Sequence, residues 1–177
     1  MTGVSLAELL KILIRPRVFV SYHHELDQWY YDQLSTILHD TYEMITDRSL
    51  DQDIDSRDAE YVMRRIREEF ITGTSCTIVL CGAETGQRKF VDWEIKATLD
   101  KEHALVGVAL PSALLVNPGV FFKPWRLDDN VVSSYAVITT WSTIIANPGY
   151  VATLIASASA KPKTLINNSR PMMTYNG

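Results

Sequence analysis

The chain has 177 residues, of which 46% are hydrophobic and 21% charged, and its formal net charge is −4. This is the balance of a globular domain that can bury a sizeable core. The negative charge argues against a nucleic-acid partner bound through its phosphates, and no segment has the length of a membrane span, so neither partner is expected.

The first predicted element is a short helix within residues 1–16. Leu6, Leu9, Leu10 and Leu13 recur at helical spacing. No basic region precedes this stretch and no cleavage site follows it, which argues against a signal peptide. The apolar stripe fits either packing on the domain or self-association.

From Arg17 onward, short apolar runs alternate with amphipathic stretches. Uninterrupted apolar strands covered by helices indicate a parallel sheet that is buried on both faces. The connections are of crossover length, which also favours parallel strands. The predicted strands are residues 17–22, 42–46, 77–81, 104–110 and 136–139, and the predicted helices are residues 26–39, 58–70, 89–101 and 148–160.

The remaining segments are predicted to be irregular. Residues 112–130 contain Pro118 and Pro124, and the tail from Lys161 is polar and contains further prolines. We expect this tail to be either loosely ordered or used in assembly. The predicted organisation is an N-terminal helix at residues 1–16, an α/β domain at residues 17–145, and a C-terminal helix and tail at residues 146–177.

The two cysteines, Cys76 and Cys81, lie five positions apart on one predicted strand. An odd spacing points their side chains to opposite faces, so they can neither form a disulfide with each other nor share a metal. We interpret them as buried thiols of a protein in the reducing cytoplasm.

Polar side chains follow the first predicted strand. Ser21, Tyr22, His23, His24 and Asp27 come together where that strand ends, and ligands of open α/β sheets bind beyond the carboxyl ends of the strands. Adjacent histidines on an extended backbone point apart, so no shared metal is expected. Asp27 fits either the rim of a pocket or an ordinary first-turn charge favoured by the helix dipole.

An acidic loop after the second strand invites a calcium interpretation. Asp51, Asp53 and Asp55 match the first three ligands of an EF-hand loop. However, Ser56 stands where the motif needs glycine, and Val62 stands where it needs glutamate. The motif is therefore rejected, and the loop is left as a mobile lid or a partner surface.

Two glycines follow the third predicted strand. Gly82 and Gly86 permit a tight turn and close approach of the backbone to a phosphate next to a helix start. The spacing is not that of a dinucleotide-binding fingerprint, so a plain strand-to-helix turn explains it equally well.

The helix that follows carries the most informative residue, Glu94. Phe90 and Glu94 are four positions apart and share a helix face, whereas Asp92 and Trp93 point elsewhere. A carboxylate beside the carboxyl end of a buried strand can hold a ribose or stabilise a cation that forms on a sugar. The alternative is a first-turn glutamate favoured by the helix dipole.

Together, these segments resemble a TIR domain, and more closely the bacterial TIR-like family that includes the TIR proteins of Thoeris anti-phage systems. The likeness covers roughly Arg17 to Thr140 in order. Each motif alone is loose, whereas their succession at these intervals is specific. The matching motifs are residues 18–22, 45–48, 74–80 and 90–94, the last being the family's aromatic-x-x-x-Glu helix.

The resemblance implies a flavodoxin-like fold with a five-stranded parallel sheet. Enzymatic members of the family cleave the nicotinamide–ribose bond of NAD, and some convert the product into a cyclic or conjugated ADP-ribose signal. NAD would thus be a substrate, and no cofactor is implied. The expected partners are other TIR domains, including further copies of this chain, and an effector that senses the nucleotide product.

The resemblance also assigns roles to individual residues. Glu94 corresponds to the family's catalytic glutamate, and it would stabilise the positive charge that builds on the ribose as the bond breaks. Trp93 or Tyr22 would stack on the leaving nicotinamide. The nucleotide pocket would be lined by Ser21, Tyr22, His23, His24, Gly82, Phe90 and Trp93, and Asp47 and Arg48 would begin a loop that moves when subunits assemble.

Some positions depart from the family pattern. Many TIR domains have tryptophan where Phe90 stands and an arginine-containing segment where His23 and His24 stand, and their mobile loop has a Pro-Gly pair that is absent here. These departures leave an alternative function open beside the enzyme, a non-catalytic TIR-like module for nucleotide binding or assembly. A phosphate-accepting receiver domain is set aside because the third strand ends in Cys81 and Gly82 rather than aspartate.

Overall fold

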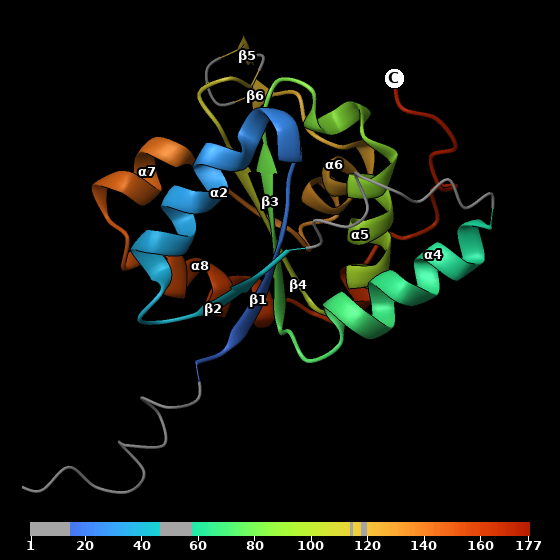
Figure 1. Cartoon of the computed structure of the whole chain (residues 1–177), viewed down its shortest axis with the longest axis horizontal. Coiled ribbons are helices and arrows are strands. Elements are labelled where there is room, and N and C mark those ends of the chain that lie inside the picture. Colours follow the sequence, from blue (N-terminus) through green and yellow to red (C-terminus); the bar gives the residue numbers. More distant parts are fainter. Residues whose placement is uncertain (1–14, 47–57, 114, 118–119) are drawn as a thin grey trace, which may run out of the picture.

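A five-stranded parallel sheet forms the centre of the molecule in a computed structural model, which describes residues 15–46, 58–113, 115–117 and 120–177 (Figure 1). The strand order is β2-β1-β3-β4-β7, and every neighbouring pair is parallel. This is the flavodoxin-like order, which confirms the predicted fold class. The strands are β1 (Arg17–Ser21), β2 (Glu43–Ile45), β3 (Cys76–Cys81), β4 (Ala104–Ala109) and β7 (Val137–Thr140).

Helices cover both faces of this sheet (Figure 1). One face packs against α2 (His24–Leu38), α7 (Trp141–Ala146) and α8 (Tyr150–Ser159). The other face packs against α4 (Ala59–Arg65), its π-helical continuation η1 (Ile66–Ile71), α5 (Lys89–Asp100) and α6 (Trp125–Val132).

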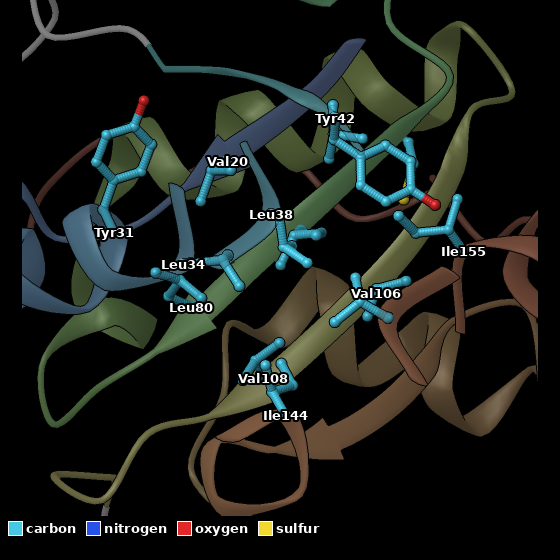
Figure 2. Close-up of a cluster of buried hydrophobic side chains, with 14 of the residues drawn as sticks. Val20, Tyr31, Leu34, Leu38, Tyr42, Leu80, Val106, Val108, Ile144 and Ile155 are labelled. Atoms are coloured by element: carbon cyan, nitrogen blue, oxygen red, sulfur yellow. The ribbon is translucent and has the colours of Figure 1, made fainter. Parts of the chain in front are cut away.

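The two faces bury separate cores because successive strand residues point to opposite sides. Val18 and Val20 of β1 lie in the core beneath α2, whereas Phe19 packs with α4 and α5. In the α2-side core, Leu34 and Leu38 form one stripe of the helix, at the spacing that the sequence predicts (Figure 2).

Side chains accept hydrogen bonds from open backbone N–H groups at the starts of α2, α4 and α7. His23 precedes α2, and its Nδ1 accepts from Leu26 N at 3.3 Å. Asp58 precedes α4 and accepts from the backbone N–H groups of Glu60 and Tyr61, both at 3.1 Å. Such contacts replace hydrogen bonds that the first turn of a helix cannot make internally. Arg88, which precedes α5, makes no such side-chain contact.

The prediction of residues 112–130 as irregular is wrong. The hairpin of β5 (Leu115–Asn117) and β6 (Val120–Phe121) lies there, and α6 begins directly after Pro124. Pro124 was expected to interrupt regular structure, although proline is compatible with a helix start, where no N–H partner is lost. Helix α7 is also additional to the predicted elements, and the described chain contains two short 3₁₀ turns, η2 (Thr85–Gln87) and η3 (Lys163–Leu165).

The C-terminal tail, residues 161–177, folds back onto α5 and α6. The expectation that it is loosely ordered is therefore wrong. The predicted N-terminal helix, apart from Arg15 and Pro16, lies outside the described residues, as do Asp47, Arg48 and the acidic loop. Within the described part of the chain, no helix has the length and apolar character needed to cross a membrane.

The thiols behave as predicted. Cys76 and Cys81 are both free and buried, and they lie in the cores of opposite faces. Burial raises the pKa of each thiol to about 12. Neither is therefore a nucleophile in the folded protein, because the thiolate is the reactive form.

Candidate functional site

Polar side chains gather where β1 and β3 end, at the point where the strand order reverses. In open α/β sheets this switch point is where ligands bind. Ser21 is the last residue of β1, and Gly82 directly follows β3. The two strands pair in register up to Ser21 and Val79, which sets these ends side by side.

A serine and a glutamate meet at this place. Ser21 Oγ donates to Glu94 Oε2 at 2.5 Å, and the two residues are 0% and 4% exposed. Ser21 points to the α5 side for the same reason as Phe19, two residues before it on β1. One turn further along α5, Thr98 Oγ1 donates to the Glu94 carbonyl at 2.8 Å and lies 2.7 Å from Thr77 Oγ1. Glu94 thus contacts β1 directly, and the next turn of α5 contacts β3 through Thr98 and Thr77.

A second carboxyl, that of Asp27, lies behind the turn that follows β3. Asp27 is 2% exposed, and Thr85 Oγ1 donates to its Oδ2 at 3.2 Å. Burial raises the pKa of Asp27, although the Thr85 hydrogen bond and the His23 ring act in the opposite direction. Asp27 does lie in the first turn of α2, as the helix-dipole interpretation requires, but it is buried rather than facing water.

Asp27 also explains the first glycine of the turn. A Cβ on Gly82 would lie 2.8 Å from Asp27 Cγ, closer than van der Waals contact. Gly82 N donates to Thr85 Oγ1 at 2.9 Å, so the same hydroxyl joins the turn to the carboxyl. This packing accounts for Gly82 without a bound phosphate, and it supports the plain-turn interpretation.

The two histidines point apart, as predicted. His23 is buried, and its Nε2 contacts Arg88 Nη2 and lies 3.6 Å from Glu84 Oε2. His24 Nε2 instead lies 3.4 Å from the Thr46 hydroxyl. In the described residues, no group of three His, Cys, Asp or Glu side chains is arranged to hold a metal.

The aromatic residues assigned to the pocket lie in other surroundings. Tyr22 is 3% exposed and stacks on Tyr31, with ring centroids 4.9 Å apart, in the α2-side core. Trp93 packs edge-on against Phe90 at 5.6 Å, and its Nε1 donates to the carbonyl of Met173 in the C-terminal tail at 2.8 Å. Tyr22 therefore lies in the core on the α2 side of the sheet, whereas Ser21 meets Glu94 on the α5 side.

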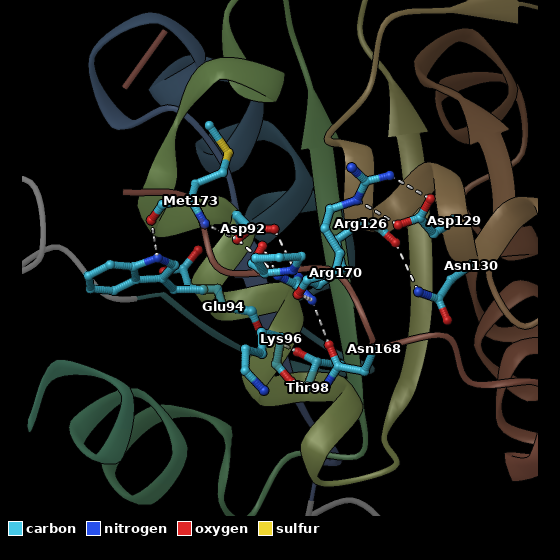
Figure 3. A network of polar contacts seen from close by, with 12 residues as sticks. Asp92, Glu94, Lys96, Thr98, Arg126, Asp129, Asn130, Asn168, Arg170 and Met173 are labelled. Atoms are coloured by element: carbon cyan, nitrogen blue, oxygen red, sulfur yellow. Dashed lines mark hydrogen bonds and ion pairs between the residues drawn. The ribbon is translucent and has the colours of Figure 1, made fainter. Parts of the chain in front are cut away.

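A network that the sequence argument missed holds the other side of α5 (Figure 3). Arg126 is 0% exposed, and its Nε and Nη2 donate to the two Asp92 carboxylate oxygens at 2.8 and 3.1 Å. The same guanidinium donates to Asn168 Oδ1 and to the carbonyl of Arg170, both at 2.9 Å. Arg126 lies 34 positions from Asp92 in the chain, so no local spacing predicts the pair. Thr85 could have been singled out from the sequence, because it lies between Gly82 and Gly86 in the predicted turn.

Two hollows, each of about 500 Å³, open elsewhere on the surface. One lies between α4, α5 and the C-terminal tail and includes Arg64, Arg67 and Lys96. The other lies beyond Gly82 and is walled by Phe122 and Trp125. Neither has Ser21 or Glu94 in its wall, so the buried pair is set apart from both.

A match to a known protein family agrees with the fold. The family model described as "Thoeris protein ThsB, TIR-like domain" matches residues 19–114, more than half of the chain. Among solved structures, the chain is similar to the TIR domains of the activated Roq1 resistosome that directly recognises the pathogen effector XopQ. That likeness has 14% identity and a TM-score of 0.41, and covers 87% of this chain and 85% of the other. None of the curated proteins matches the chain.

Proposed function

Because the chain belongs to the family of the TIR-like domain of Thoeris protein ThsB, we propose that it is an NAD-consuming enzyme that cleaves the nicotinamide–ribose bond. Its product would be a cyclic or conjugated ADP-ribose, which an effector senses during anti-phage defence. The observation that carries this proposal is the buried contact between Ser21 and Glu94 at the switch point of the sheet. NAD is the substrate, and no further cofactor is proposed.

The chemistry suits a fixed carboxylate. Cleavage of the bond between ribose C1′ and the nicotinamide nitrogen leaves both electrons on the nitrogen and positive charge on the ribose, as in glycoside hydrolysis. A preorganised carboxylate at Glu94 would stabilise that charge. The Ser21 hydroxyl supports this role, because its hydrogen bond fixes the carboxylate without bringing a positive charge of its own. Nicotinamide departs as a neutral molecule, so the step needs no strong general acid.

The second half of the reaction decides the product. If water attacks C1′, free ADP-ribose forms. If a hydroxyl of the same nucleotide attacks, the product is cyclic, and if a second molecule attacks, the product is a conjugate. We propose that His23, His24 and Gly82 border the nucleotide, that Asp47 and Arg48 belong to a loop that responds to assembly with other TIR domains, and that the enzyme works in the cytoplasm.

The test compares NAD turnover by the wild type and Glu94→Gln, with products separated by mass spectrometry. We expect release of nicotinamide to fall at least about 100-fold in the variant, the size of loss found when a transition-state contact is removed. Glu69→Gln is the matched control, because it makes the same change at an exposed ion pair with Arg65. Full turnover by Glu94→Gln would overturn the assignment.

One observation favours the alternative, a nucleotide-binding or assembly module without turnover. Glu94 is 4% exposed, and neither hollow reaches it. For this alternative we expect saturable NAD binding by calorimetry, or self-association, with no nicotinamide released by the wild type at any protein concentration.

A further inference from the structure

The C-terminal tail lies along the whole of α5, the helix that carries Glu94, and runs in the opposite direction. Near the end of α5, Asn168 Nδ2 donates to Asp100 Oδ1 at 2.8 Å. Near its start, Asn176 Oδ1 accepts from Lys89 N at 2.9 Å. The tail therefore runs antiparallel to α5 and contacts both ends of the helix.

The middle of the tail forms hydrogen bonds with Asp92 and Trp93, the two residues before Glu94. Met173 N donates to Asp92 Oδ2 at 2.9 Å, and Met173 O accepts from Trp93 Nε1 at 2.8 Å (Figure 3). Ser21 holds Glu94 on the inner side of the same turn. The rotation of α5 about its axis is therefore set from both sides, and that rotation decides where the Glu94 carboxylate lies.

Asn176 has a specific task in this arrangement. Arg88, the residue before α5, makes no side-chain contact with the open N–H groups of the first turn. Instead, the backbone N–H of Lys89 donates to Asn176 Oδ1, although the two residues are 87 positions apart in the chain. A side-chain oxygen at this place opposes fraying of the first turn. The cap of the Glu94 helix thus comes from the far end of the chain.

We propose that Asn176 is a positioning residue, which caps α5 from the C-terminal tail and so holds Glu94 in its place against Ser21. The activity part of this inference rests on the proposed NAD cleavage. Its structural part does not, because the order of the first turn of α5 can be measured without substrate.

Three variants test this role. Asn176→Ala removes the accepting oxygen, Asn176→Asp keeps it, and Tyr175→Ala changes the neighbouring residue, which is 81% exposed. With NAD, we expect Asn176→Ala to lower kcat about tenfold and to leave KM within about twofold, because a misplaced catalytic group costs rate rather than binding. Asn176→Asp and Tyr175→Ala should match the wild type. An equal loss of kcat in Asn176→Ala and Asn176→Asp would overturn the capping role.

Hydrogen exchange separates this inference from the proposed function. We expect the backbone amides of Lys89 to Trp93 to exchange about tenfold faster in Asn176→Ala than in Asn176→Asp or the wild type. If the wild type released no nicotinamide, the proposed function would fail, and the exchange rates alone would decide whether Asn176 positions α5. Unchanged exchange in Asn176→Ala would overturn the positioning role, whatever the activity.

Discussion

Two carboxylates of α5, Asp92 and Glu94, are both buried but are held in different ways. They are 2% and 4% exposed. On the α6 side, Asp92 meets the wholly buried guanidinium of Arg126 through two hydrogen bonds. On the β1 side, Glu94 meets the hydroxyl of Ser21. One contact brings an opposite charge to its carboxylate, and the other contact does not.

This difference separates Asp92, whose ion pair with Arg126 holds the structure together, from Glu94, a candidate catalytic group. A bidentate pair with arginine satisfies both charges in place and fixes geometry. A hydroxyl orients a carboxylate without neutralising it, which suits a group that must meet a developing cation. If the two sides of α5 divide in this way, substitutions on each side should change the stability of the fold by different amounts.

The largest effect on stability is expected when the charge of Asp92 is removed, in comparison with removal of the charge of Glu94. Asp92→Asn leaves Arg126 buried without its counter-charge, so we expect the free energy of unfolding to fall by about 3–5 kcal/mol. Glu94→Gln keeps a side-chain oxygen that can accept from the Ser21 hydroxyl, so we expect the change at this contact to cost less than about 1 kcal/mol. Urea unfolding followed by circular dichroism measures both. Equal losses in the two variants would contradict the division between the two sides.

A smaller effect is expected at the turn on the β1 side. Gly82→Ala forces a methyl group against the Asp27 carboxyl, and overpacking of this kind costs about 1–3 kcal/mol of unfolding free energy. Gly149→Ala is the control, because its Cβ would find the nearest atom, Asn147 Oδ1, at 3.6 Å. The same stability in both variants would show that the turn yields to the added methyl group.

The smallest effect is a pH dependence from Asp27. Burial raises the pKa of this carboxyl above its usual value of 3.8, so between the two values the folded protein binds more protons than the unfolded chain. Asp27 therefore stabilises the fold fully below pH 3.8, and this contribution is lost as pH rises through the raised pKa. When the free energy of unfolding is measured from pH 3.5 to 7, the value for Asp27→Asn should rise relative to that of the wild type as pH rises. A constant difference between the two proteins would exclude this linkage.

The sequence predicts the sheet well because its information is local. The apolar runs of β1, β3 and β4 and the stripe of Leu34 and Leu38 can be recognised within a few residues. The succession of these elements also indicates the family. Glu94 could be singled out for the same reason, since it stands on a predicted helix beside the end of a predicted strand.

What the sequence does not predict depends on distant pairs. Arg126 matters because of Asp92 and the C-terminal tail, and neither partner is near it in the chain. Trp93 depends on a distant partner in the same way, because its indole N–H donates to the carbonyl of Met173 in the C-terminal tail. The role that the resemblance gives to Trp93, stacking on the nicotinamide ring, stays a prediction.

The two buried thiols give the protein a pair of internal reporters. Cys76 lies beneath α2 and α8, and Cys81 lies on the α5 and α6 side. With pKa values of about 12, neither reacts until its own layer opens. Alkylation read by mass spectrometry at each cysteine would therefore time the opening of the two layers separately, and show whether the molecule comes apart as one unit or one face at a time.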